Sequence, residues 1–191
     1  FAAVGILLIG VDDLCFDVLW LTARWRQRRV RAGNAVSGQE PVVIERDGGG
    51  VDGPLAIFLP AWDEHEVLPD TLAHMLAAWD GEDFRIYLGC YPNDERTILS
   101  VSRLLSTDER VRLVVADRNG PTTKGHNLNQ MWAALGVDER AMGRRYAAVV
   151  LHDAEDVVHP MELSLYRKML VQHSMVQIPV QAIINPQSPW V

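Results

Sequence analysis

The fold is decided by residues 54–89, which read PLAIFLPAWDEHEVLPDTLAHMLAAWDGEDFRIYLG. This stretch contains short apolar runs at 55–62 and 84–89, each with the length and composition of a buried strand. Between them, apolar residues recur every three or four positions from 67 to 79, as on the buried face of an amphipathic helix. A strand, a helix and a second strand in this order predict a βαβ unit, in which the two strands lie parallel.

The same alternation continues towards the end of the chain. Further helices are expected at 95–105, 125–135 and 161–172, and further strands at 111–116, 146–152 and 175–184. Crossover connections between parallel strands are right-handed and place helices on both faces of the sheet. The sequence therefore predicts an α/β fold, with a Rossmann-like and mostly parallel sheet that is covered by helices on both faces.

The first 31 residues form a separate region, which is expected to be membrane-associated. Residues 1–21 open with eleven apolar or glycine residues, and three aspartates then interrupt the run. A complete span takes about 20 mostly apolar residues, and carboxylates inside lipid are costly. The segment is therefore interpreted as the end of a span, a re-entrant piece or an interfacial helix, with a buried core helix as the alternative. Five arginines between residues 24 and 31 favour the membrane, because basic residues collect on the cytoplasmic flank of a span.

Composition and charge limit what the rest of the chain does. Residues 32–53 are rich in glycine and polar residues, which predicts a linker with one short strand at 42–45. The net charge is −7, and because arginines concentrate at 24–31 the remainder is strongly acidic. An acidic body argues against a nucleic-acid-binding surface. The two cysteines, Cys15 and Cys90, show neither a disulfide framework nor a zinc-binding spacing.

Polar clusters follow four of the predicted strands. They read DEHE at 63–66, YPND at 91–94, DRNG at 117–120 and HDAED at 152–156. In open parallel sheets the carboxyl ends of the strands meet at one edge, and ligands bind there. The sequence therefore predicts a binding site built from these loops.

The sharpest cluster lies in VVLHDAEDVVHP, residues 149–160, where three carboxylates fall within four residues. If the strand persists through the cluster, Asp153 and Glu155 point to the same side. Paired hard oxygen ligands suit Mg²⁺ or Mn²⁺ shared with phosphate oxygens. The alternative is a solvated turn in which Asp156 caps the next helix.

A second cluster, GPTTKGHNLNQMWAAL at 120–135, leads from a loop into a helix through Lys124, one of only two lysines in the chain. Loop amides and a helix N-terminus favour anions, so Lys124 is a candidate phosphate ligand, with a plain surface lysine as the alternative. Asn127 and Asn129 either cap the helix or hydrogen-bond a ligand. The histidines show no metal-binding spacing, and we expect His126, His152 and His159 to be structural.

These segments carry a resemblance. PLAIFLPAWDEHEVLPDTL, TKGHNLNQMWAAL and VVLHDAEDVVHPMEL are similar, in order and spacing, to the nucleotide-sugar half of family-two glycosyltransferases, over roughly residues 54–184. Members of that family are inverting enzymes with the so-called A-type fold. The apolar start, the YPND turn and the DAED cluster most resemble bacterial inner-membrane glycosyltransferases linked to phage adsorption and exopolysaccharide production. This resemblance implies a location at the bacterial inner membrane, with the domain on the cytoplasmic side.

The resemblance also implies roles for individual residues. The implied nucleotide-sugar-binding residues are Pro60, Ala61, Glu64, Tyr91, Asp94, Lys124, Asn129 and Asp153. Asp153 and Glu155 would hold the metal, with Glu155 standing where the family usually has Asp, and Asp63 stands where it usually has Asn. Cys90 and Tyr91 occupy the place of an acidic residue that reads the base, which leaves the nucleotide open.

The activity implied is metal-dependent transfer of a sugar, with inversion, from a nucleoside-diphosphate sugar to a hydroxyl of a glycan or lipid-linked acceptor. The family's catalytic base lies in a later motif that does not follow 176–184 here. Residues 54–191 are therefore expected to be the N-terminal, nucleotide-sugar-binding part of the domain, which binds donor without transferring it.

Two other functions stay open. One is a non-catalytic nucleotide-binding regulatory module in a membrane polysaccharide or adsorption system, for which the departures at Tyr91 and Glu155 would be the signature. The other is a nucleotidyltransferase, which would usually show a glycine-rich loop after the first strand, whereas PAWDEHE at 60–66 has no glycine.

Overall fold

The computed structural model describes Thr22 and residues 50–180. The expected membrane segment, the short strand expected at 42–45 and nearly all of the expected linker lie outside the described residues. Among the described residues, no helix is both long and apolar enough to cross a membrane. The chain divides into two compact units, Phe1–Val43 and Ile44–Val191, and the fold described below belongs to the second.

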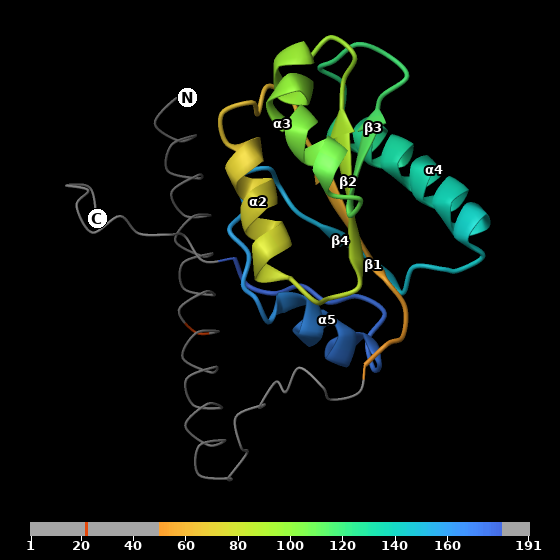
Figure 1. The fold of residues 1–191 in the computed structure, drawn as a ribbon. Helices are drawn as coiled ribbons and strands as arrows, with labels where there is room; N and C mark the ends of the chain where they lie inside the picture. The colour runs from red at the N-terminus through yellow and green to blue at the C-terminus, as the bar shows by residue number, and fades with distance from the viewer. Residues whose placement is uncertain (1–21, 23–49, 181–191) are drawn as a thin grey trace, which may run out of the picture. The chain divides into compact units, whose positions relative to one another are not determined.

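A four-stranded parallel sheet forms the centre of this unit (Figure 1). Its strands are β1 (Leu55–Pro60), β2 (Phe84–Cys90), β3 (Val111–Val115) and β4 (Ala148–Leu151). They lie in the order β3-β2-β1-β4, and all three pairings are parallel. The prediction of a parallel α/β sheet is confirmed, and β1 lies inside the sheet, with apolar side chains packed on both of its faces.

Helices connect the strands and cover both faces of the sheet, as predicted. They are α2 (Leu68–Ala78), α3 (Glu95–Thr107), α4 (Lys124–Met142) and α5 (Glu162–Leu170). Leu55, Ile57 and Leu59 of β1 belong to one apolar cluster together with side chains of α2, α3 and α5. Ala56 and Phe58 belong to a second cluster, formed with α4. The alternation along β1 thus assigns α4 to one face of the sheet and the other three helices to the opposite face.

Most element boundaries lie within two residues of the sequence prediction, but one helix and one predicted strand differ more. Helix α4 continues from the predicted end at 135 to Met142, through Gly136, and ends where Gly143 takes up a left-handed φ of 62°. Strand β4 is shorter than predicted and stops at Leu151. The strand predicted at 175–184 is wrong over its described part, because 175–180 forms no ladder with any described strand. Met175 and Val180 are exposed, whereas Val176 and Ile178 pack against the core without strand pairing.

Because all four strands are parallel, their carboxyl ends lie along one edge of the sheet. The loops that begin at Ala61, Tyr91, Ala116 and His152 leave the sheet from this edge. These are the four loops in which the sequence places its polar clusters, so the fold brings them together.

Candidate functional site

The loop after β1 is fixed to the start of α3 by two backbone amides. The amide of Asp63 donates to Asp94 Oδ2 over 2.8 Å, and that of Glu64 donates to Thr97 Oγ1 over 3.1 Å. Asp63 has a left-handed φ of 58°, a conformation that asparagine and aspartate tolerate better than most residues. Asp94 also caps α3, since its Oδ1 accepts from the amide of Thr97 at 3.4 Å. The buried Asp94 carboxylate is thus engaged by the chain itself, and its expected contact with a donor stays a prediction.

Pro60 and Ala61 present mainly backbone to the site. Pro60 ends β1 opposite Gly89, and the amide of Ala61 donates to Gly89 O over 2.9 Å. Ala61 is buried, whereas Pro60 is partly exposed. The role that the resemblance implies, a backbone wall beside the nucleoside, is compatible with this placement.

An aromatic cluster joins the loops that follow β1, β2 and β3. The rings of Trp62 and Tyr91 meet edge to face with centroids 5.3 Å apart, and Tyr91 Oη lies 2.8 Å from Thr122 Oγ1. Gly120 packs directly on both rings: a Cβ at this position would lie 2.7 Å from Tyr91 Cγ. Asn93 exchanges hydrogen bonds with the Gly120 backbone at 2.7 and 2.8 Å. These contacts bury Tyr91, so its side chain holds the loops together, and its expected contact with a donor stays a prediction.

The acids of three loops form one negative centre. Partial burial raises the pKa of Glu64, and the carboxylates of Glu155, Asp63, Asp153 and Asp94 raise it further. Glu64 follows β1, Asp94 follows β2, and Asp153 and Glu155 follow β4. The structure therefore brings Glu64, from the loop after β1, into one electrostatic neighbourhood with Asp153 and Glu155, from the segment after β4.

The acidic segment after β4 is a turn and not a continued strand. The amide of Asp156 donates to Asp153 O at 3.1 Å, and Asp156 Oδ2 accepts from the amide of Asp153 at 3.0 Å. The condition under which Asp153 and Glu155 would share a strand face is therefore not met. Nor does Asp156 cap the next helix, because the residue at the N-cap of α5 is Met161. The cause is that β4 ends at Leu151, so the following residues have no ladder to hold them extended.

Lys124 opens α4 and forms an ion pair with the acidic turn. Its Nζ donates to Asp153 Oδ1, and both side chains are about half exposed. The helix start itself is capped by Thr123, whose Oγ1 accepts from the amide of His126 over 3.2 Å. His126 in turn lies 2.9 Å from Asp117 Oδ1. The lysine loop and the acidic turn are thus in direct contact, although they are far apart in sequence.

The two asparagines of α4 differ in placement. Asn129 is exposed, and no contact of its side chain tests its expected role. Asn127 is 1% exposed and donates through Nδ2 to Gly89 O over 2.9 Å. A Cβ on Gly89 would lie 2.0 Å from Asn127 Oδ1, so this approach requires glycine in β2. Asn127 therefore joins α4 to the sheet, a role that the sequence did not predict, and the helix is capped by Thr123 instead.

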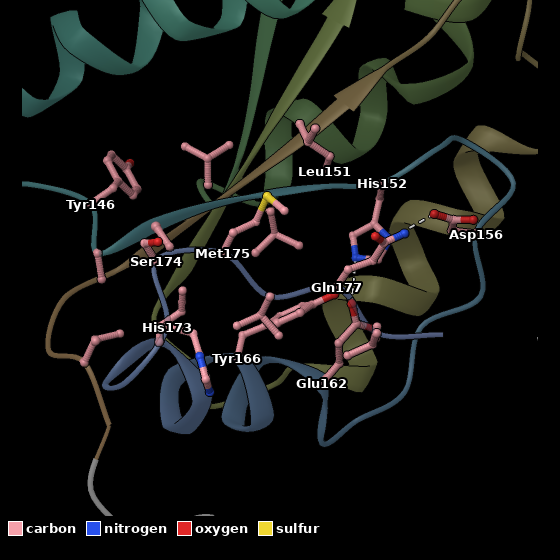
Figure 2. Close-up of a pocket in the computed structure, with 18 of the residues that line it drawn as sticks. Tyr146, Leu151, His152, Asp156, Glu162, Tyr166, His173, Ser174, Met175 and Gln177 are labelled. Carbon is pink, nitrogen blue, oxygen red and sulfur yellow. Dashed lines mark hydrogen bonds and ion pairs between the residues drawn. The ribbon is translucent and has the colours of Figure 1, made fainter. Parts of the chain in front are cut away.

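His152 is a buried residue whose partners the sequence did not predict. Figure 2 shows it between Asp156 and Glu162, with Nδ1 3.0 Å from Asp156 Oδ2 and Nε2 2.9 Å from Glu162 Oε1. The contact with Glu162 is a close ion pair without the alignment of a good hydrogen bond. Burial opposes protonation of His152, but the two carboxylates outweigh it and raise the pKa of the imidazole. These residues line a pocket beside β4 that also includes Glu155 and Tyr166.

The carboxylates of this centre fit a divalent cation that is shared with a ligand. Within residues 50–180, no three His, Cys, Asp or Glu side chains are arranged to hold a metal by themselves. Mg²⁺, however, commonly takes one or two carboxylates and completes its shell with phosphate oxygens and water. Asp153 and Glu155 supply such hard donors. Burial first, and then the neighbouring carboxylates, raise the pKa of Glu64, and a cation would relieve the repulsion among these acids.

Comparisons with known proteins agree with this arrangement. The family described as "Glycosyltransferase like family 2" matches residues 53–190. The chain is 35% identical over 179 residues to "Bacteriophage adsorption protein B" of Escherichia coli strain K12, and equally to "Bacteriophage N4 adsorption protein B" of Escherichia coli O157:H7. The match covers 93% of this chain but only 23% of each relative. With its parallel sheet and strand-end site, the chain belongs to the glycosyltransferase-like family 2 and contains a glycosyltransferase-type domain.

Proposed function

We propose that this chain binds the donor of a glycosyl transfer in which a sugar passes, with inversion, from a nucleoside diphosphate to an acceptor hydroxyl. The observation that carries the proposal is the convergence of Glu64, Asp153 and Glu155 at the carboxyl edge of a parallel sheet, with Lys124 paired to Asp153. An acidic centre repels a bare diphosphate. Binding therefore needs cations, and Lys124 together with Mg²⁺ or Mn²⁺ would supply them.

Each group has a proposed task. A divalent cation held by Asp153 and Glu155 would supply Lewis-acid stabilisation of the diphosphate leaving group. Lys124 would donate to a diphosphate oxygen as a preorganised electrostatic contact. The backbone at Pro60 and Ala61 would flank the nucleoside beside the buried ring of Tyr91.

The acceptor hydroxyl also needs a general base. Among the described carboxylates, Asp156 is close to the acidic turn, but its Oδ2 accepts from the amide of Asp153 and lies 3.0 Å from His152 Nδ1. Its hydrogen bonds give it a structural task, so we assign it no role as base. The acceptor is proposed to be a glycan or lipid-linked hydroxyl at the bacterial inner membrane, with the domain on the cytoplasmic side. The arginine-rich segment at 24–31 supports that location.

The test is calorimetric titration of the full chain with UDP, GDP, ADP, CDP and dTDP, each with and without Mn²⁺. We expect one or more nucleotides to bind only with metal, and Asp153→Asn or Glu155→Gln to weaken that binding by about tenfold or more. Glu109→Gln, an exposed acid outside the centre, is the matched control and should bind as the wild type does. Unchanged metal-dependent affinity in both site variants would place the site elsewhere.

A non-catalytic nucleotide-binding module is the second candidate. It is favoured by Tyr91, whose side chain is engaged by Trp62 and Thr122 where related enzymes are expected to carry an acid. Metal-dependent hydrolysis of a nucleoside-diphosphate sugar, measured as release of the nucleoside diphosphate, tests this candidate. Turnover by the chain excludes the non-catalytic module, whereas binding without turnover agrees with both candidates, because residues 54–191 are expected to bind donor without transferring it.

A further inference from the structure

Two side chains of α2 and that of its C-cap residue, Trp79, reach the backbone of the segment that carries the acidic turn. Thr71 Oγ1 donates to Ala154 O over 2.6 Å, and Trp79 Nε1 donates to His159 O over 3.2 Å. His74 Nε2 lies 3.0 Å from Val158 O, to which it donates in the tautomer protonated at that nitrogen. Helix α2 thus provides hydrogen bonds to carbonyls that have left the ladder of β4.

Two residues of the same segment are buried against the core. Ala154 is 2% exposed and Val158 is 4% exposed, and both belong to the apolar cluster that contains Leu72 and Met75 of α2. The two residues that flank Ala154, by contrast, are exposed. The Thr71 hydroxyl is therefore bonded to the buried peptide that lies between two exposed carboxylates, those of Asp153 and Glu155.

We propose that Thr71 is a positioning residue, which fixes the turn that holds Asp153 and Glu155 at the spacing needed for cation binding. The proposal rests on the proposed function for its consequence, but not for its geometry. Without the Thr71 hydroxyl, the Ala154 carbonyl would lose a partner, and the peptide that links the two carboxylates could rotate more freely. Residues that orient metal ligands from behind commonly change metal affinity without touching the metal.

A purely structural role for Thr71 predicts something different. Its hydroxyl also lies 3.2 Å from Val67 O, one turn earlier at the start of α2, so losing it removes a local helix contact as well. Such a loss would change the stability of the fold and would leave the exchange of the acidic turn and its affinity for cations unaffected. Two substitutions separate these roles: Thr71→Val removes the hydroxyl and keeps the shape, whereas Thr71→Ser keeps the hydroxyl. Thr107→Val in α3 is the matched control, because the Thr107 hydroxyl contacts only carbonyls of its own helix.

The first measurement uses the full chain without metal or nucleotide. Amide hydrogen exchange is followed in peptides that cover residues 152–160. Thr71→Val should accelerate exchange there by about three- to tenfold, as expected for one lost hydrogen bond, while Thr71→Ser and Thr107→Val stay within about twofold of the wild type. Unchanged exchange in Thr71→Val, or equal acceleration in Thr71→Ser, would overturn the proposal.

The second measurement is the affinity for Mn²⁺ in the presence of a nucleoside diphosphate, read from the electron paramagnetic resonance signal of free Mn²⁺. Thr71→Val should weaken it by about three- to tenfold, and Thr71→Ser should restore it. A loss in Thr107→Val of the same size would also overturn the proposal. If the wild type binds no Mn²⁺, the proposed function fails, and the exchange measurement still decides whether Thr71 holds the turn.

Discussion

Replacing Lys124 should change the affinity for metal and the affinity for nucleotide in opposite directions. Its Nζ is bonded to Asp153 Oδ1, one of the oxygens that a cation would use. In the absence of nucleotide, Lys124 and the cation therefore compete for the same carboxylate. Replacing Lys124 with methionine keeps the length of the side chain and removes this competitor.

The expected magnitudes follow from the exposure of the pair. Both side chains are about half exposed, and an exposed ion pair contributes roughly 0.2–1 kcal/mol. Lys124→Met should therefore tighten Mn²⁺ binding to the nucleotide-free chain by up to about fivefold. With a nucleoside diphosphate present, the variant loses a charge-assisted contact of about 1.5–3 kcal/mol, so the nucleotide should bind about ten- to hundredfold more weakly.

The assay is a Mn²⁺ titration followed by electron paramagnetic resonance, first without nucleotide and then with it. Lys168→Met, on α5, is the control for the loss of a lysine, because it removes the only other lysine of the chain. Arg118→Met removes a cation that is bonded to Asp117 and leaves Asp153 untouched, so it corrects for the general effect of charge. Weaker or unchanged Mn²⁺ binding in Lys124→Met without nucleotide would refute the competition. Tightening of equal size in Arg118→Met would reduce it to a long-range charge effect.

Three further predictions concern the fold. Arg167 of α5 donates to Gly53 O at 2.6 Å and to Asp83 O at 2.7 Å, so Arg167→Met should lower the free energy of unfolding in urea by about 2–4 kcal/mol. Burial raises the pKa of Cys90 to about 12, so in a Cys15→Ala background iodoacetamide at pH 8 should modify Cys90 only after unfolding, as read by mass spectrometry. Hydrogen bonds from Arg110 lower the pKa of Asp108, so the ionised carboxylate stabilises the fold at pH values above the ordinary pKa of aspartate. In urea unfolding, Asp108→Asn should therefore be less stable than the wild type at pH 7, and this difference should vanish as the pH falls through the lowered pKa.

The order of strands and helices was predictable because burial leaves a periodic trace in sequence. The core strand β1 is a run of apolar residues, and α2 buries Leu68, Leu72, Met75 and Leu76 at helical spacing. Element ends were less predictable. The helix predicted at 125–135 continues through Gly136 to Met142, and the left-handed backbone of Gly143 ends it.

The site was predictable at the level of loops but not of geometry. Parallel strands bring their carboxyl ends to one edge, so the convergence of Glu64 with the DAED cluster followed from the fold. The shape of the acidic turn did not, because its contacts come from distant positions. Thr71 lies 83 residues from Ala154, and no local pattern distinguishes this half-buried threonine from any other threonine on a helix. The Lys124–Asp153 pair spans 29 residues, so no local sequence pattern predicted it either.

These contacts share one feature: each loop of the site is hydrogen-bonded or ion-paired to a neighbouring loop or helix. The loop after β1 is held by Asp94 and Thr97 at the start of α3. Gly120, in the loop after β3, is held by Asn93 from the loop after β2. The turn after β4 is held by Thr71 of α2 and by Lys124 of α4.

This mutual support has an energetic consequence. A substitution in one loop removes a partner from another loop, so effects on donor binding should not add for pairs in contact. Asn93 and Tyr91 illustrate the point, because both hold the segment 120–122, one through the Gly120 backbone and the other through Thr122. The parallel sheet determines only where its loops begin. The contacts between the loops then determine whether the carboxylates stay close enough to share one cation.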